Sequence, residues 1–98
     1  MEFQVSIKVD WPPDGDPTQR DELVEAESRR ARELVAEGVI LRLWRIPGRW
    51  ANIGIWEAPD ATALHEAISS LPLYAWLQIE VQALAHHPSD PVAGPAST

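Results

Sequence analysis

Hydrophobic and polar residues alternate strictly over the first ten positions of the chain. Phe3, Val5 and Ile7 stand between polar residues, and the alternation continues to Trp11. A period of two is typical of a strand with one buried face. The Pro-Pro-Asp-Gly-Asp-Pro segment at residues 12–17 consists of turn-forming residues and predicts the end of this strand.

A long helix is predicted over residues 18–37, because this segment is composed mainly of Ala, Leu, Glu and Arg. Asp16 followed by Pro17 is typical of an N-cap with proline at the first helical position. Gly38 supplies the residue type that most often ends a helix.

Three strands and a second helix are predicted from the rest of the chain. The apolar segments 39–46 and 50–56 flank Pro47-Gly48, which predicts a β-hairpin. A shorter helix is expected to begin at Pro59-Asp60 and to end near residue 69, before Leu71-Pro72-Leu73. Alternation over residues 76–84 predicts the last strand.

The resulting order is β-α-β-β-α-β, which indicates an α+β, ferredoxin-like subunit: an antiparallel four-stranded sheet with two helices on one face. The second and third strands carry large apolar residues at odd and at even positions, and therefore on both faces of the sheet. Examples are Leu43 beside Trp44 and Ile55 beside Trp56. Helices on one face do not account for this pattern. We therefore expect the other face to meet another subunit, with cover by loops or the tail as the alternative.

Length and composition fit one small domain. The 98 residues, of which 45% are hydrophobic and 23% charged, exclude wholesale disorder but give a core near the lower size limit. Oligomerisation is the expected source of additional stability. We expect a domain over residues 1–88 and a flexible tail over residues 89–98, which are rich in Pro, Ser, Ala and Gly.

The charge balance and the absence of cysteine narrow the function. With 8 basic and 15 acidic residues the net charge is −7, which argues against nucleic-acid binding. No Cys is present, so disulfides, thiolate nucleophiles and Cys-ligated metals are excluded. No apolar segment is long enough to cross a membrane and no signal peptide is recognisable, so we expect a cytoplasmic protein without a membrane partner.

Glu27 is the strongest candidate for chemistry. On a helical wheel its carboxylate falls in the middle of the apolar face, between Leu34 and Ala31. Burial of an unpaired carboxylate raises its pKa towards neutrality, which suits a base that removes a proton from carbon. The alternative is a buried ion pair with Arg30, one turn away.

Other candidates are weaker individually. Arg42, Arg45 and Arg49 cluster around the hairpin, and one of them is suited to bind a substrate carboxylate. Charges that protect an edge strand are the alternative. His65 lies at the margin of the second helix's apolar face, and a structural histidine is the alternative there. Five aromatic residues have the character of pocket walls, or of core and interface residues: Trp44, Trp50, Trp56, Tyr74 and Trp76. Three histidines without carboxylates at ligand spacing do not indicate a metal site.

Several short segments together resemble the muconolactone Δ-isomerase family, over residues 1 to about 90 and without gaps. They are Leu43-Trp44-Arg45-Ile46, Ala51-Asn52, Ala63-Leu64-His65, Leu71-Pro72-Leu73, Ile79-Glu80-Val81 and His87-Pro88-Ser89. The resemblance implies a subunit that pairs into a dimeric α+β barrel, ten subunits in typical members, and neither metal nor organic cofactor.

The reaction implied by the resemblance moves the ring double bond of an unsaturated lactone, within aromatic degradation through 3-oxoadipate. A base removes the proton γ to the lactone carbonyl, and the dienolate is reprotonated at the α carbon. The family's glutamate falls at Glu27, and Arg45 matches as the residue for the substrate carboxylate. The expected substrate-binding residues are Arg45, His65, Asn52, Trp44, Trp50, Tyr74 and His87.

Some positions depart from the family pattern and make the expected pocket more apolar. Val24 stands where members usually carry a lysine, and Trp50 where an aromatic hydroxyl is common. An isomerase or cyclase of a larger apolar substrate is therefore one alternative function. A non-catalytic ligand-binding module on the same fold is the other.

Overall fold

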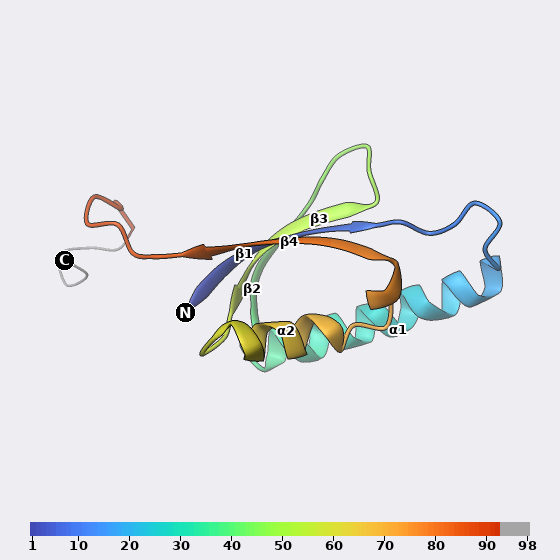
Figure 1. Cartoon of the computed structure of the whole chain (residues 1–98), viewed down its shortest axis with the longest axis horizontal. Coiled ribbons are helices and arrows are strands. Elements are labelled where there is room, and N and C mark those ends of the chain that lie inside the picture. The colour runs from blue at the N-terminus through green and yellow to red at the C-terminus, as the bar shows by residue number, and fades with distance from the viewer. Residues whose placement is uncertain (93–98) are drawn as a thin grey trace.

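A computed structural model describes residues 1–92. Its elements, drawn in Figure 1, are β1 (Glu2–Val9), α1 (Pro17–Ala36), β2 (Ile40–Arg45), β3 (Ala51–Glu57), α2 (Ala61–Ser69), the short 3₁₀ helix η1 (Tyr74–Trp76) and β4 (Leu77–Leu84). The predicted tail falls partly outside the described residues, because positions 93–98 are not among them. No helix within residues 1–92 combines the length and apolar character needed to cross a membrane.

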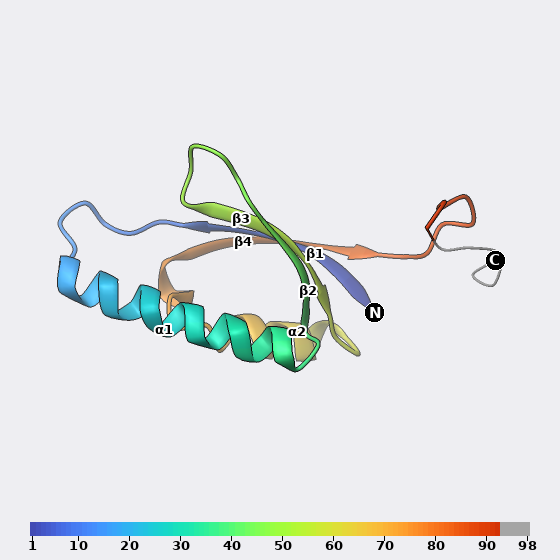
Figure 2. The ribbon, with the colours of Figure 1, turned by 180° about the vertical axis from the view of Figure 1, so that it is seen from behind.

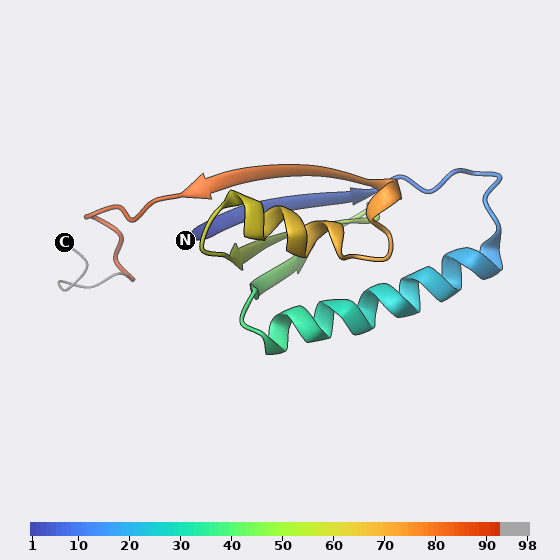
Figure 3. The same ribbon diagram turned by 60° about the horizontal axis from the view of Figure 1, so that its bottom comes forward.

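The four strands form one antiparallel sheet in the order β2-β3-β1-β4. Both helices lie on the same side of this sheet, as Figures 1 and 2 show from opposite directions. Seen from below, α1 and α2 run side by side in opposite directions (Figure 3). This is the ferredoxin-like arrangement that the order of elements predicts.

The hydrophobic core fills the space between the helices and the sheet. Phe3, Val5 and Ile7 of β1 contribute one face of that strand, each 5% exposed or less. The polar residues between them point to the other face, as the period of two requires. The rest of the core is Leu34, Ile40, Trp56, Ala58, Leu64, Ile68 and Leu71.

The predicted helix signals are confirmed. The side chain of Asp16 accepts a hydrogen bond from the Thr18 N–H at 2.9 Å and Pro17 is the first residue of α1. Asp60 caps α2 in the same manner through the Ala63 N–H. Gly38 follows α1 with a φ of 76°, a left-handed conformation that favours glycine.

Two features of the elements differ from the prediction. The apolar face of α1 is narrower than the wheel suggests, since Val24 and Val35 are exposed by 38% and 52%. The last strand begins at Leu77, because residues 74–76 form η1 instead of extended chain.

The face of the sheet opposite the helices has no covering element within residues 1–92. Cross-strand pairing places Ser6, Ile53 and Trp44 in one row on this open face, and Gln4, Ile55 and Arg42 in the next. Trp44 is 45% exposed there. β2 and β3 thus present apolar residues both to the helix-covered side of the sheet and to its open face, as the sequence predicts.

Candidate active site

Glu27 lies halfway along α1 and is partly buried. Its Oε1 accepts a hydrogen bond from the backbone N–H of Leu73 at 3.1 Å. Leu73 belongs to the segment between α2 and η1 and is only 2% exposed. The helix therefore presents the carboxylate inwards, as the wheel predicts.

The Leu71-Pro72-Leu73 sequence explains why a backbone donor is free at this point. The N–H of Leu71 donates to the carbonyl of Ile68 near the end of α2, and the N–H of Tyr74 donates to the carbonyl of Leu71. Pro72 has no N–H. The Leu73 N–H is left for a partner outside the turn, and a buried donor must find one. Glu27 is that partner.

Burial dominates the electrostatics of Glu27. Desolvation raises the pKa of its carboxyl above the ordinary value of 4.5, and the hydrogen bond from Leu73 partly opposes this rise. In the described part of the chain Glu27 forms no ion pair. The carboxylate is thus a stronger base than an exposed glutamate.

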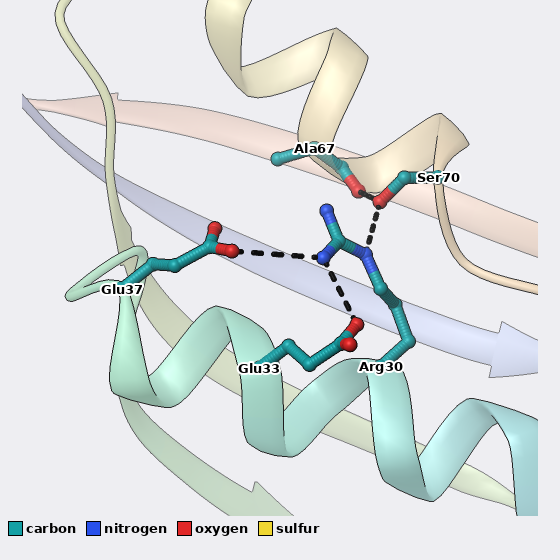
Figure 4. Close-up of polar contacts among 5 residues, drawn as sticks. All are labelled: Arg30, Glu33, Glu37, Ala67 and Ser70. Atoms are coloured by element: carbon teal, nitrogen blue, oxygen red, sulfur yellow. Dashed lines mark hydrogen bonds and ion pairs between the residues drawn. The ribbon is translucent and has the colours of Figure 1, made fainter.

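The alternative of a buried Glu27–Arg30 ion pair is wrong. The guanidinium of Arg30 instead contacts Glu33 of its own helix at 3.2 Å and Glu37 at the C-cap of that helix at 3.8 Å. Its Nε donates to the Ser70 hydroxyl at 2.9 Å (Figure 4). The charge of Arg30 is engaged away from Glu27.

Arg45 and Asn52 share the helix-covered side of the sheet with Glu27. Ile7, a core residue of β1, pairs with Asn52, and Asn52 pairs with Arg45. Directly opposed residues in a sheet point to the same face. The Oδ1 of Asn52 is buried and has no hydrogen-bond partner within residues 1–92.

A cavity of about 220 Å³ at the hairpin collects four of the predicted residues. Its walls are Leu43, Trp44, Arg45, Trp50, Ala51 and Asn52. Trp44 reaches it from the open face, where the Arg42 guanidinium lies 4.6 Å from the ring centroid of Trp44. Of the arginines around the hairpin, Arg45 is thus the one that combines the helix side with this cavity.

His65 and Tyr74 meet at a second cavity, of about 270 Å³, between α2 and β4. Their rings pack edge to face with centroids 6.3 Å apart. The other walls are Ala61, Leu64, Ile68, Ile79 and Val81. Tyr74 directly follows Leu73, so this cavity adjoins the segment that binds Glu27.

His87 is placed apart from the other predicted residues. It follows β4, whose eight residues span roughly 26 Å at about 3.3 Å each. Figure 1 shows that this end of β4 leads away from η1. The Nδ1 of His87 accepts the Ser89 N–H at 3.0 Å, a local turn contact. Within one subunit, His87 does not join the Glu27 site.

Two partners in this region were not predicted from the sequence: the Leu73 N–H and the Ser70 hydroxyl. The only available signal was the proline at position 72, which removes a donor and interrupts the backbone pairing. Within residues 1–92, no group of three His, Asp or Glu side chains is arranged to hold a metal ion.

Comparison with known proteins gives consistent matches. The sequence model of the family described as muconolactone delta-isomerase matches residues 1–90. A muconolactone Delta-isomerase from Pseudomonas aeruginosa is 39% identical over 89 residues, covering 91% of this chain and 93% of that protein. The Rhodococcus opacus muconolactone Delta-isomerase is 39% identical over 88 residues, covering 90% and 95% respectively.

Solved structures agree at the level of the fold. A crystal structure of muconolactone isomerase superposes with a TM-score of 0.87 at 38% identity, covering 93% of this chain and 95% of that one. The 5-chloro-2-hydroxyhydroquinone dehydrochlorinase of Burkholderia phenoliruptrix has a TM-score of 0.66 at 18% identity, covering 89% and 96%. The second likeness concerns the fold alone.

Proposed function

The chain belongs to the muconolactone Δ-isomerase family, and we propose that it moves the ring double bond of muconolactone by proton transfer through Glu27. The observation that carries the role of Glu27 is its setting: a partly buried carboxylate without an ion pair in the described residues, facing one neutral backbone donor. Such a group combines raised basicity with a fixed orientation.

The proposed reaction has two proton transfers. The Glu27 carboxylate removes the proton from the γ carbon of the lactone. The C–H electron pair becomes the new β,γ double bond, and the former α,β π electrons move towards the carbonyl to give a dienolate. The carboxylic acid then returns the proton to the α carbon, and the carbonyl re-forms. Atoms and electrons balance within the substrate, so the step requires no oxidant, reductant or organic cofactor.

One carboxyl group suffices for both transfers because the α and γ carbons are separated by a single ring carbon. The Leu73 hydrogen bond holds Oε1 and leaves Oε2 as the oxygen for the substrate. A base held in one orientation gains from proximity to both carbons. We assign the proton transfer to Oε2 on this ground.

Arg45 and Asn52 are the proposed binding groups. The guanidinium of Arg45 suits the carboxymethyl arm of the substrate, because a planar fork binds a carboxylate through two parallel hydrogen bonds. Asn52 also lines this cavity, and its buried Oδ1 has no hydrogen-bond partner within residues 1–92. Trp50 supplies an apolar wall beside them.

The open face of the sheet is the proposed subunit interface. Ile53 and Ile55 are only partly covered there, and Trp44 is 45% exposed. Two copies that place these faces together would bury this apolar surface. A dimeric α+β barrel is the resulting assembly. The ten-subunit state, the tail over residues 89–98 and the cytoplasmic location stay predictions.

The proposed substrate is tested with purified protein and muconolactone, followed by the ultraviolet change on isomerisation. Turnover is the expected result. Lactones in which an alkyl group replaces the carboxymethyl arm are the matched comparison, because they cannot use Arg45. If only the alkyl lactones were converted, the substrate would instead be a larger apolar compound. The apolar side chains of Leu43, Trp44 and Trp50 at the hairpin cavity also suit such a substrate. Tight binding of muconolactone without conversion would favour a ligand-binding module.

A further inference from the structure

We propose that Arg30 and Ser70 form a polar latch that positions the Leu73 N–H, and through it the carboxylate of Glu27. Neither residue touches the reacting atoms, so both are positioning residues. The inference rests on the proposed function, in which Glu27 is the base.

Two contacts connect α1 to the segment after α2, and they form consecutive steps of a ladder. Glu27 accepts from the Leu73 N–H at 3.1 Å, and Arg30 donates to the Ser70 hydroxyl at 2.9 Å. Arg30 lies three residues after Glu27 on α1, and its partner Ser70 lies three residues before Leu73. Both contacts therefore hold the same short piece of chain against the same helix face.

The guanidinium of Arg30 is held ready for this contact by its own helix. Glu33 on α1 and Glu37 at its C-cap bind Nη1 and leave Nε directed towards α2 (Figure 4). The Ser70 hydroxyl accepts from Nε and donates to the Ala67 carbonyl at 2.6 Å. Ser70 is thereby held at the C-cap of α2 while it receives the arginine.

The latch reaches Glu27 through a short and stiff connection. Pro72 fixes one backbone dihedral between Ser70 and Leu73. Leu73 is also nearly fully buried. A small displacement of this segment would lengthen the hydrogen bond from Leu73 to Glu27. Because Leu73 is buried, water could not readily take the place of the lost donor. The carboxylate would then lose both its orientation and the one contact that lowers its pKa.

No other charged group of the described structure pairs with the carboxylate of Glu27. The ionisable side chains on the elements around Glu27 include Arg30 and Glu33 on α1, Glu37 at the C-cap of α1, His65 and Glu66 on α2, Tyr74 in η1, and Arg45 on β2. None of them forms an ion pair with Glu27 in the described structure. Burial and the Leu73 hydrogen bond are the two influences on its pKa.

The test compares four variants with the wild type. Ser70→Ala removes the acceptor and Arg30→Met removes the donor, whereas Ser70→Thr keeps the hydroxyl. Arg29→Met is the matched control, because Arg29 pairs with Glu25 on the exposed side of the same helix. Ser70 is exposed, so its substitution leaves the core intact. The pKa of Glu27 is measured by ¹³C NMR of the labelled carboxyl, and kcat and KM are measured with muconolactone.

In Ser70→Ala and Arg30→Met, the pKa of Glu27 is expected to rise, because the hydrogen bond from Leu73 that lowers it is weakened. We also expect kcat to fall about tenfold in both variants while KM changes less than about twofold. Ser70→Thr and Arg29→Met should behave as the wild type does.

An unchanged pKa or an unchanged kcat in Ser70→Ala would overturn the latch. Equal effects in Arg29→Met would also overturn it, because they would indicate a general loss of charge. If the wild type did not convert muconolactone, the proposed function would fail separately, and the NMR titration would still decide whether the latch positions Glu27.

Discussion

The Oε1 atom of Glu27 lies 3.1 Å from the backbone nitrogen of Leu73 and accepts its hydrogen bond. The partner of this partly buried carboxylate is thus a neutral donor. A cation in this place would lower the pKa of Glu27 strongly and make it a weaker base. A single neutral N–H fixes the carboxylate while desolvation keeps its pKa raised.

The stability of the protein should depend on the ionisation of Glu27. The folded protein binds the proton of this residue more tightly than the unfolded chain does, because burial raises its pKa above 4.5. The contribution to stability is fully present below about pH 4.5 and is lost as the pH rises through the folded pKa. Glu27→Gln removes this loss. We therefore expect its free energy of unfolding, relative to the wild type, to increase between about pH 4.5 and pH 7.

Urea unfolding at several pH values measures this difference. Glu25→Gln is the control, since Glu25 is exposed on the same helix. A difference between Glu27→Gln and the wild type that does not change with pH would contradict the raised pKa.

The pH dependence of the rate should report the same group. Glu27 must be ionised to accept the γ proton, so kcat/KM is expected to fall on the acid side, with a midpoint above 4.5. A series of initial rates from pH 4 to 9 measures this midpoint. A midpoint at or below the ordinary glutamate value would show that the reactive base is not desolvated.

Arg45→Gln should weaken substrate binding. Loss of the charged hydrogen bonds to a carboxylate corresponds to roughly a 10- to 100-fold rise in KM, with a smaller change in kcat. Arg42→Gln is the matched control, because Arg42 lies on the open face and over the Trp44 ring. Equal KM values for the two variants would remove Arg45 from the binding site.

The proposed interface predicts that a charge on the open face separates the subunits. Ile53→Asp places a carboxylate in the middle of this face, and we expect analytical ultracentrifugation to show monomers. Val35→Asp makes a comparable change at an exposed position of α1 and should leave the assembly intact. An assembly that survives Ile53→Asp would place the interface elsewhere.

The fold was largely predictable because the patterns that define it are local. The alternation in β1, the caps Asp16 and Asp60 and the turn glycine Gly38 each act within a few residues. The η1 turn was not predicted. Its formation depends on backbone pairing around Pro72, for which the sequence has no periodic signal.

The site was predictable only in part. A helical wheel placed Glu27 on the inner side of α1 because that placement depends on helix geometry alone. The wheel could not distinguish Arg30 from a backbone donor as its partner. The outcome depends on Ser70 and Leu73, which lie 40 and 46 positions from their partners Arg30 and Glu27 and approach α1 only in the folded chain.

The central claim is that Glu27 accepts the proton from carbon, and the rate of Glu27→Gln tests it most directly. The amide keeps the shape of the side chain and can still accept the Leu73 hydrogen bond, but it cannot serve as the base. With muconolactone as substrate, we expect kcat to fall at least about 100-fold in Glu27→Gln, while Glu25→Gln turns over at the wild-type rate. A folded Glu27→Gln protein with a near-normal kcat would contradict the account.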